Sequence, residues 1–422
     1  MRELCLSEHY TDEEFISHCS GELAMGNSVF VQLSRAFPVE LVCSGLRRLE
    51  WRASHHRLHS LRHFLSPTLT EIEIFTTPSG DSFQSPSPAI PVLPGSYLRS
   101  LQLTFQPADD EAFGTLASAT ILQCGAFLER LETSAQLSEA AVSHIVGLPH
   151  LHTLRIGSGP PPDPAGGPTP YFFTSLETLT LESGVGHRWL ALLEAAQGSS
   201  STDGNSGTPE AGMKTTLTNL RCLGRTTVDP TFTSSLCIFR NLTHVFADGS
   251  CSKKDGCTFL LTDDVLAKLA DALPDLKSLQ LGSPCSANRC HTTALSLFIL
   301  STRCLKLKTL EIHFNTTKIS HLLDRLFKEP QYERMRSLPR CPLRYLNVAD
   351  TPISTHDVGS VAIRFSGIFH GLQGFRSRHI NWTEASRKVR LLFNFRMDIA
   401  PGTCIVSKTS GISSYTLPED NG

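Results

Sequence analysis

The fold is decided by the stretch Thr262-Asp263-Asp264-Val265-Leu266-Ala267-Lys268-Leu269-Ala270-Asp271-Ala272-Leu273-Pro274-Asp275-Leu276-Lys277-Ser278-Leu279-Gln280-Leu281, which predicts one helix followed at once by one strand. The Thr262 hydroxyl can cap the helix, two aspartates favour its first turn, and apolar residues follow at helical spacing. Pro274 ends the helix. Leu279 and Leu281 are two residues apart and so point to the same side of the strand. One helix and one strand therefore form a unit.

The strand of this unit follows the pattern L-x-x-φ-x-φ, where φ is usually aliphatic, and the pattern recurs in eleven clear copies. Met1-Arg2-Glu3-Leu4-Cys5-Leu6 looks like a twelfth copy, cut by the start of the chain. The first leucines are about 30 residues apart on average, just beyond the roughly 20 to 29 residues of a leucine-rich repeat. The copies begin at Leu46, Leu69, Leu98, Leu128, Leu151, Leu176, Leu217, Leu242, Leu276, Leu307 and Leu343.

The residues between the φ positions point to the opposite side of each strand, and most of them are polar or charged. A strand buried on both faces could not carry these side chains without a large desolvation cost. The sequence therefore predicts an α/β leucine-rich-repeat solenoid, a horseshoe with a concave parallel β-sheet and an irregular helical convex side. The side chains expected on the wet face include Arg48, Glu50, Glu71, Glu73, Gln102, Arg130, Glu132, Arg155, Thr180, Arg221, Gln280, Glu311 and Asn347.

The chain is expected to divide into three parts. Residues 1–375 form the solenoid of 11 or 12 irregular repeats, 376–396 form a C-terminal capping helix region, and 397–422 form a flexible tail. The cap rests on the amphipathic pattern of 382–396, and further helices are predicted over 294–304 and 358–369. Stretches 77–96, 157–170 and 198–212 are rich in Pro, Gly and Ser and are predicted to be loops between strands.

Composition restricts the class of protein. The 422 residues carry 38 Lys+Arg against 40 Asp+Glu, which argues against general binding to nucleic acid or to acidic membranes. No run of apolar residues is long enough to span a bilayer, and the amino terminus lacks a signal-peptide pattern. We therefore expect a cytoplasmic or nuclear protein, in which the 13 cysteines are thiols.

No catalytic or nucleotide-binding motif is present, so we expect no enzyme, no cofactor and no bound metal. Two groups of residues have metal-binding chemistry. His55, His59 and His63 have helical spacing, and we interpret them as the solvated face of a helix that buries Leu58, Leu61 and Leu65. The second group lies after two successive strands, where its spacings favour ordinary loop thiols over a metal site: Cys251, Cys257, Cys285, Cys290 and His291.

The basic residues near the carboxy terminus also have two readings. A solvated face of the capping helix is favoured over an anion-binding patch. These residues are Arg376, Arg378, Arg387, Lys388, Arg390 and Arg396, with Glu384 as the single acid among them.

Three segments resemble the F-box leucine-rich-repeat proteins of fungi, particularly of mushroom-forming species: Phe64-Leu65-Ser66-Pro67-Thr68-Leu69-Thr70, the stretch from Leu261-Thr262-Asp263-Asp264 to Pro274-Asp275-Leu276-Lys277-Ser278-Leu279, and Leu343-Arg344-Tyr345-Leu346-Asn347-Val348. The resemblance implies a substrate-recognition subunit of an SCF-type ubiquitin ligase, with a protein target held by the repeats. In that family an F-box precedes the repeats, whereas repeat-like sequence here begins at Met1. A Skp-type adaptor is therefore an expected partner only if an F-box is encoded upstream. The alternative is a stand-alone leucine-rich-repeat regulator.

The concave face is the expected binding surface for this unidentified protein partner, because solenoids present their inner sheet as an extended surface. Phe246 occupies an otherwise mostly polar position, so it either contacts a partner or is covered by a loop such as 198–212. Arginine and aromatic side chains are enriched in binding hot spots. The candidate residues are Glu50, Glu73, Arg155, Arg221, Phe246, Glu311 and Tyr345.

Overall fold

The computed structural model describes residues 3–7, 23–25, 32, 35–36, 44–52, 58–76, 97–106, 111–158, 173–190, 216–248, 260–282, 291–328 and 342–397, with short breaks inside several of the longer ranges. The strands within them form one sheet, in which every pair of neighbours is parallel. The strands are β1 (Glu3–Ser7), β2 (Leu23–Met25), β3 (Arg48–Arg52), β4 (Glu71–Thr76), β5 (Ser100–Phe105), β6 (Arg130–Gln136), β7 (Thr153–Ser158), β8 (Thr178–Leu181), β9 (Asn219–Cys222), β10 (His244–Ala247), β11 (Ser278–Leu281), β12 (Thr309–Glu311), β13 (Tyr345–Asn347) and β14 (Gly374–Arg376).

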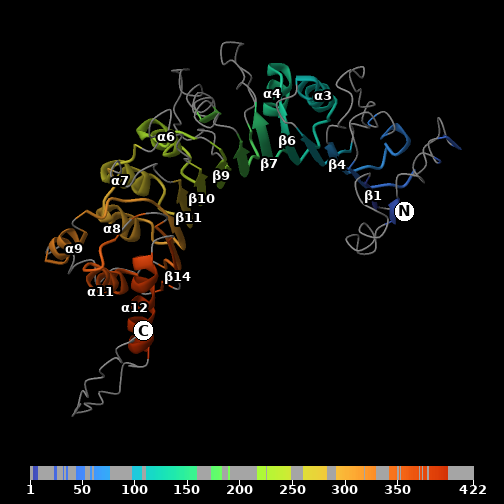
Figure 1. Cartoon of the computed structure of the whole chain (residues 1–422). Helices are drawn as coiled ribbons and strands as arrows, with labels where there is room; N and C mark the ends of the chain where they lie inside the picture. The colour runs from blue at the N-terminus through green and yellow to red at the C-terminus, as the bar shows by residue number, and fades with distance from the viewer. Residues whose placement is uncertain are drawn as a thin grey trace, which may run out of the picture.

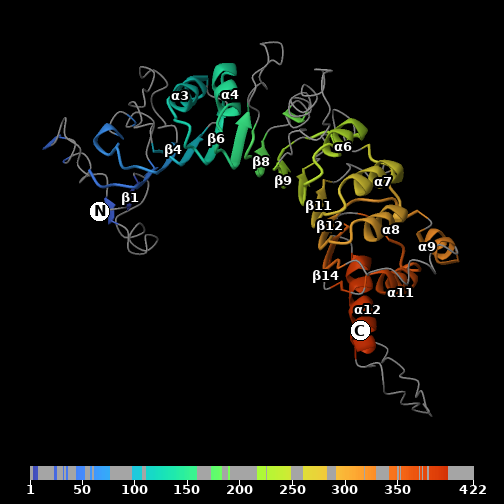
Figure 2. The same cartoon turned by 180° about the vertical axis from the view of Figure 1, so that it is seen from behind.

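Short strands alternate with helices, and the chain curves into an arc with the strands on its inner side and the helices on its outer side (Figures 1 and 2). This is an α/β fold that fits a leucine-rich-repeat-like solenoid, as the strand pattern predicts. The helices are α3 (Glu111–Leu122), α4 (Glu139–Val146), α6 (Pro230–Leu236), α7 (Asp263–Ala272), α8 (Ala294–Arg303), α9 (Ile319–Lys328), α11 (Val358–Ile368) and α12 (Ile380–Met397).

The predicted repeat unit is present in α7 and β11. The Thr262 hydroxyl accepts a hydrogen bond from the Val265 amide at 3.4 Å and caps α7, as predicted. The Asp263 carboxylate in the first turn accepts hydrogen bonds from the Thr293 amide at 2.8 Å and from the Thr293 hydroxyl at 2.6 Å. Because Thr293 is the N-cap of α8, this contact ties the start of one outer helix to the start of the next.

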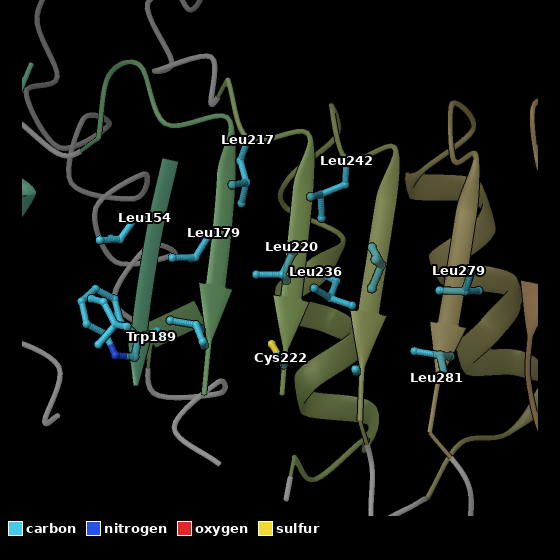
Figure 3. Close-up of a cluster of buried hydrophobic side chains, with 14 of the residues drawn as sticks. Leu154, Leu179, Trp189, Leu217, Leu220, Cys222, Leu236, Leu242, Leu279 and Leu281 are labelled. Carbon is cyan, nitrogen blue, oxygen red and sulfur yellow. The ribbon is translucent and has the colours of Figure 1, made fainter. Parts of the chain in front are cut away.

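The core lies between the sheet and the helices. Leu49, Leu101, Leu154, Leu279 and Leu346 all lie on strands of the sheet and are almost fully buried, as predicted. The parallel register places equivalent leucines opposite one another, and Figure 3 shows them at the same level of successive strands. Each leucine therefore packs against its counterparts in the neighbouring units, and the core runs along the arc.

The two ends of the sheet differ from the predicted order. Of the predicted copy at Met1–Leu6, the described residues from Glu3 onward belong to β1 (Glu3–Ser7), but β1 lies between β3 and β2, and β2 forms the described edge. At the other end β14 is an additional strand. Its sequence has Leu372 and Phe375 at the expected spacing but Ser377 at the next φ position, which hides it from a search for aliphatic residues.

The predicted C-terminal helix corresponds to α12, which begins two residues earlier and packs on α11 and β14. The Trp382 indole N–H donates to the Thr351 carbonyl at 2.8 Å. Its ring lies against Phe314 and Phe365, with ring centroids 6.1 and 5.9 Å away. The division at residues 375 and 396 stays a prediction, and residues 398–422, nearly all of the predicted tail, lie outside the described residues.

Two residues predicted to be solvated are buried. His63 is 3% exposed, because residues 61–63 form a 3₁₀ turn in which a four-residue spacing does not keep side chains on one face. His55 and His59 lie outside the described residues. Thr180 is 8% exposed, because its short side chain lies between the longer side chains of Arg155 and Arg221 on the neighbouring strands.

Leu279→Ala is expected to destabilise the protein by about 2 to 5 kcal/mol, because it leaves a cavity in the continuous core. Gln280→Ala, one residue along the same strand and on the opposite face, should change stability by less than about 0.5 kcal/mol. Urea unfolding followed by circular dichroism measures both. Equal losses for the two variants would contradict the assigned faces.

Gly157→Ala is expected to destabilise the protein by about 1 to 3 kcal/mol. A Cβ at Gly157 in β7 would lie 2.2 Å from the carbonyl oxygen of Ser134, where the register between β6 and β7 shifts. The matched control is Gly359→Ala in α11, where a Cβ meets no atom within 4 Å and alanine favours the helix. Loss of stability in both variants, measured by thermal unfolding, would show that the close approach at Gly157 is not the cause.

Candidate protein-binding face

We define the inner face as the side chains of the strands that point away from the helices. All seven candidate residues belong to it, but only two pairs of them are neighbours in the sheet. Glu50 on β3 lies beside Glu73 on β4, and Arg221 on β9 lies beside Phe246 on β10. Glu311 on β12 and Tyr345 on β13 lie on neighbouring strands but are offset by two residues, and Arg155 on β7 is separated from the other candidates.

The inner face of β3 to β8 forms a hollow of about 540 Å³. Four glutamates and two arginines are among the residues that line it. Arg155 joins two acids, with nitrogen-to-oxygen distances of 2.5 Å to Glu182 and 3.8 Å to Glu132. The Glu132 carboxylate also accepts from Arg130 at 2.5 and 2.8 Å. The arginines of this half are thus compensated within the protein.

The same pairing continues on β3 and β4. Arg48 lies 3.3 Å from Glu73 and 3.8 Å from Glu71, while Arg52 lies 2.5 Å from Glu50. Exposed ion pairs of this kind stabilise a protein little, so their main effect is to fix the side chains that line the hollow. The two glutamates predicted as candidates, Glu50 and Glu73, are therefore already engaged with arginines.

Phe246 has a different neighbour from the one expected. The Arg221 guanidinium carbon lies 5.4 Å from the centre of the Phe246 ring, within the range of a cation–π contact. Phe246 is half-buried and Arg221 is exposed. The aromatic ring is thus covered in part by the adjacent strand, while residues 198–212 lie outside the described residues. The pair presents a flat, positively charged surface.

Two further polar side chains of the inner face are His244 on β10 and Tyr345 on β13. Tyr345 is 55% exposed, which is unusual for an aromatic side chain on a strand. Burial, followed by the charges of Lys277 and Lys308, lowers the pKa of His244 below its usual range. The imidazole is therefore neutral at pH 7. Neither lysine belongs to the candidate set, although both stand directly after the first leucine of a repeat, where a basic residue recurs.

The thiols within the described part of the chain do not mark a reactive site. Burial raises the pKa of Cys124 and of Cys222 to about 12, so both are protonated at neutral pH. Across the described ranges no three His, Cys, Asp or Glu side chains are grouped closely enough to hold a metal ion. Of the second group, which we interpret as ordinary loop thiols, only His291 is described, and it is exposed.

Comparison with models of known protein families finds none that matches this chain, and none of the curated proteins matches it in sequence. The structure therefore defines a class, a repeat α/β protein with one long parallel sheet. Within the part of the chain that the structure describes, no helix combines the length and the apolar character needed to cross a bilayer.

The contact between Arg221 and Phe246 is expected to contribute about 0.5 to 1 kcal/mol to stability. A double-mutant cycle with Arg221→Ala and Phe246→Leu, measured by urea unfolding, tests this coupling. The matched cycle combines Arg155→Ala with Phe246→Leu, whose side chains lie on strands that are not neighbours. We expect additive effects there, and a coupling of similar size in both cycles would contradict a specific contact.

Proposed function

We propose that this protein is a non-enzymatic scaffold that holds a protein partner on its inner face. The observation that carries the proposal is one continuous parallel sheet with an inner face of charged and aromatic side chains, among them Arg155, Arg221 and Tyr345. These residues take no part in the core, and Arg and Tyr are enriched where proteins bind one another. An arc of this kind offers an extended surface to a partner.

The finer proposal is that this scaffold is the substrate-recognition part of an SCF-type ubiquitin ligase receptor, or a relic of one that lacks the F-box. It is supported by the likeness of the repeat segments to the F-box leucine-rich-repeat proteins of fungi. In this proposal the inner face holds the target protein, and a Skp-type adaptor joins only through an F-box. Without one, the protein acts as a stand-alone regulator that binds its partner in the same way.

Affinity capture from a lysate, quantified by mass spectrometry, tests the scaffold. Proteins retained by the wild type should be lost with the double variant Arg221→Ala/Phe246→Ala. They should be kept by Lys268→Ala/Ile363→Ala, which removes one cation and one exposed apolar side chain from the outer helices α7 and α11. Equal retention by all three folded proteins would refute binding at this part of the inner face.

The ligase role has a separate test. The transcript upstream of the Met1 codon is sequenced, and the protein made from it is mixed with a purified Skp-type adaptor. An in-frame F-box and a complex on size-exclusion chromatography are the expected results for a receptor. A stop codon directly upstream, with no complex, would favour the stand-alone regulator.

A further inference from the structure

The two halves of the inner face differ in whether their positive charges form ion pairs. On β3 to β7 each arginine of the inner face is paired with a glutamate of the same face or of a strand end. On β9 to β14 Glu311 is the only carboxylate within the strands as the structure bounds them, and Asp248 directly follows β10. Five cations lie on or directly before these strands, and none of them has an ion pair with another described residue: Arg221, Lys277, Lys308, Arg344 and Arg376.

Three of these cations directly precede the consecutive strands β11, β12 and β13. Lys277, Lys308 and Arg344 each follow the first leucine of their repeat, and all are exposed. The Lys308 amide donates to the Lys277 carbonyl at 2.7 Å, and the Arg344 amide donates to the Lys308 carbonyl at 2.8 Å. The three residues are therefore separated only by the distance between neighbouring strands, about 4.8 Å. We call them the basic ladder.

No described carboxylate forms an ion pair with the basic ladder. Like charges at this separation repel one another and destabilise a sheet. The nearby carboxylate of Asp275 lies 2.7 Å from Lys306 and is engaged there. The charges of Lys277 and Lys308 reach His244 on the inner face, where they favour its neutral form. An exposed row of like charges that costs stability indicates an anionic partner outside the chain.

We propose that the inner face of β9 to β14 binds an extended segment of a partner protein that is rich in Asp and Glu. The carboxylates of the segment pair with the basic ladder at the amino ends of β11 to β13, and the exposed Tyr345 and the Arg221–Phe246 pair contact its apolar atoms. Arg376 on β14 extends the positive surface to the end of the described sheet. The inference rests on the proposed scaffold function and assigns to it the chemistry of the partner.

Charge distribution favours an acidic peptide over a nucleic acid. A long polyanion that followed the arc would meet the glutamates of the amino half, including Glu50, Glu73 and Glu182, within the same inner face. The whole chain also carries a formal charge of −2. A short acidic segment avoids both, because it needs to contact only the strands from β9 onward.

The test measures binding of a fluorescent glutamate-rich peptide to the full chain by fluorescence anisotropy. We expect binding that weakens as salt is added, because salt screens exposed charges. The variant Lys277→Ser/Lys308→Ser/Arg344→Ser should bind about tenfold more weakly, since each exposed ion pair contributes modestly. The matched control, Lys268→Ser/Lys328→Ser/Arg390→Ser, removes three exposed charges from α7, α9 and α12 and should bind as the wild type does.

Three results would overturn the proposal. They are undetectable binding of the glutamate-rich peptide by the folded wild type, an equal loss of affinity in both triple variants, and tighter binding of a single-stranded oligonucleotide than of the peptide. Circular dichroism shows whether each variant is folded. If the captured partner depends on Arg221 and Phe246 but is unaffected by the triple variant Lys277→Ser/Lys308→Ser/Arg344→Ser, the scaffold function stands and the acidic-segment inference fails.

Discussion

One backbone hydrogen bond, repeated from unit to unit, fixes the rest of the structure. The amide of the residue after each first leucine donates to the carbonyl of the equivalent residue in the preceding unit, as Lys277 does to Thr243 at 2.7 Å and His152 does to Glu129 at 2.8 Å. The bond sets the register of each strand against its neighbour. With the register fixed, apolar residues meet on one side of the sheet and polar residues on the other. The core and the inner face therefore follow from the same constraint.

The parts of the fold that follow from local chemistry could be predicted from the sequence. Burial of leucine every second residue defines a strand with one dry face, and the Thr262 cap and Pro274 mark both ends of α7. These signals lie within a few residues of each other along the chain. The strand β14 and the burial of His63 escaped prediction, because the first has a serine where an aliphatic residue is expected and the second depends on a turn type that spacing does not reveal.

The candidate site was predicted only in outline. The strand phase places all seven residues on the inner face, since alternation alone decides it. Their partners could not be predicted, because ion pairs such as Arg155 with Glu182 join residues from different units. The contact of Arg221 with Phe246 likewise depends on which strands are neighbours. The basic ladder is visible in the sequence only when the repeats are aligned by their first leucines.

The alternation of buried and exposed side chains along most of the strands has a consequence for evolution. Leu220 and Leu279 are held by the core, whereas Arg221 and Gln280 beside them are almost free of it. In the proposed scaffold, a substitution at an inner position would therefore change what the arc recognises without changing how it folds. Because these positions recur unit after unit, selection could then revise the recognised sequence one residue at a time. A protein that binds in this way would keep its fold while its specificity diverges.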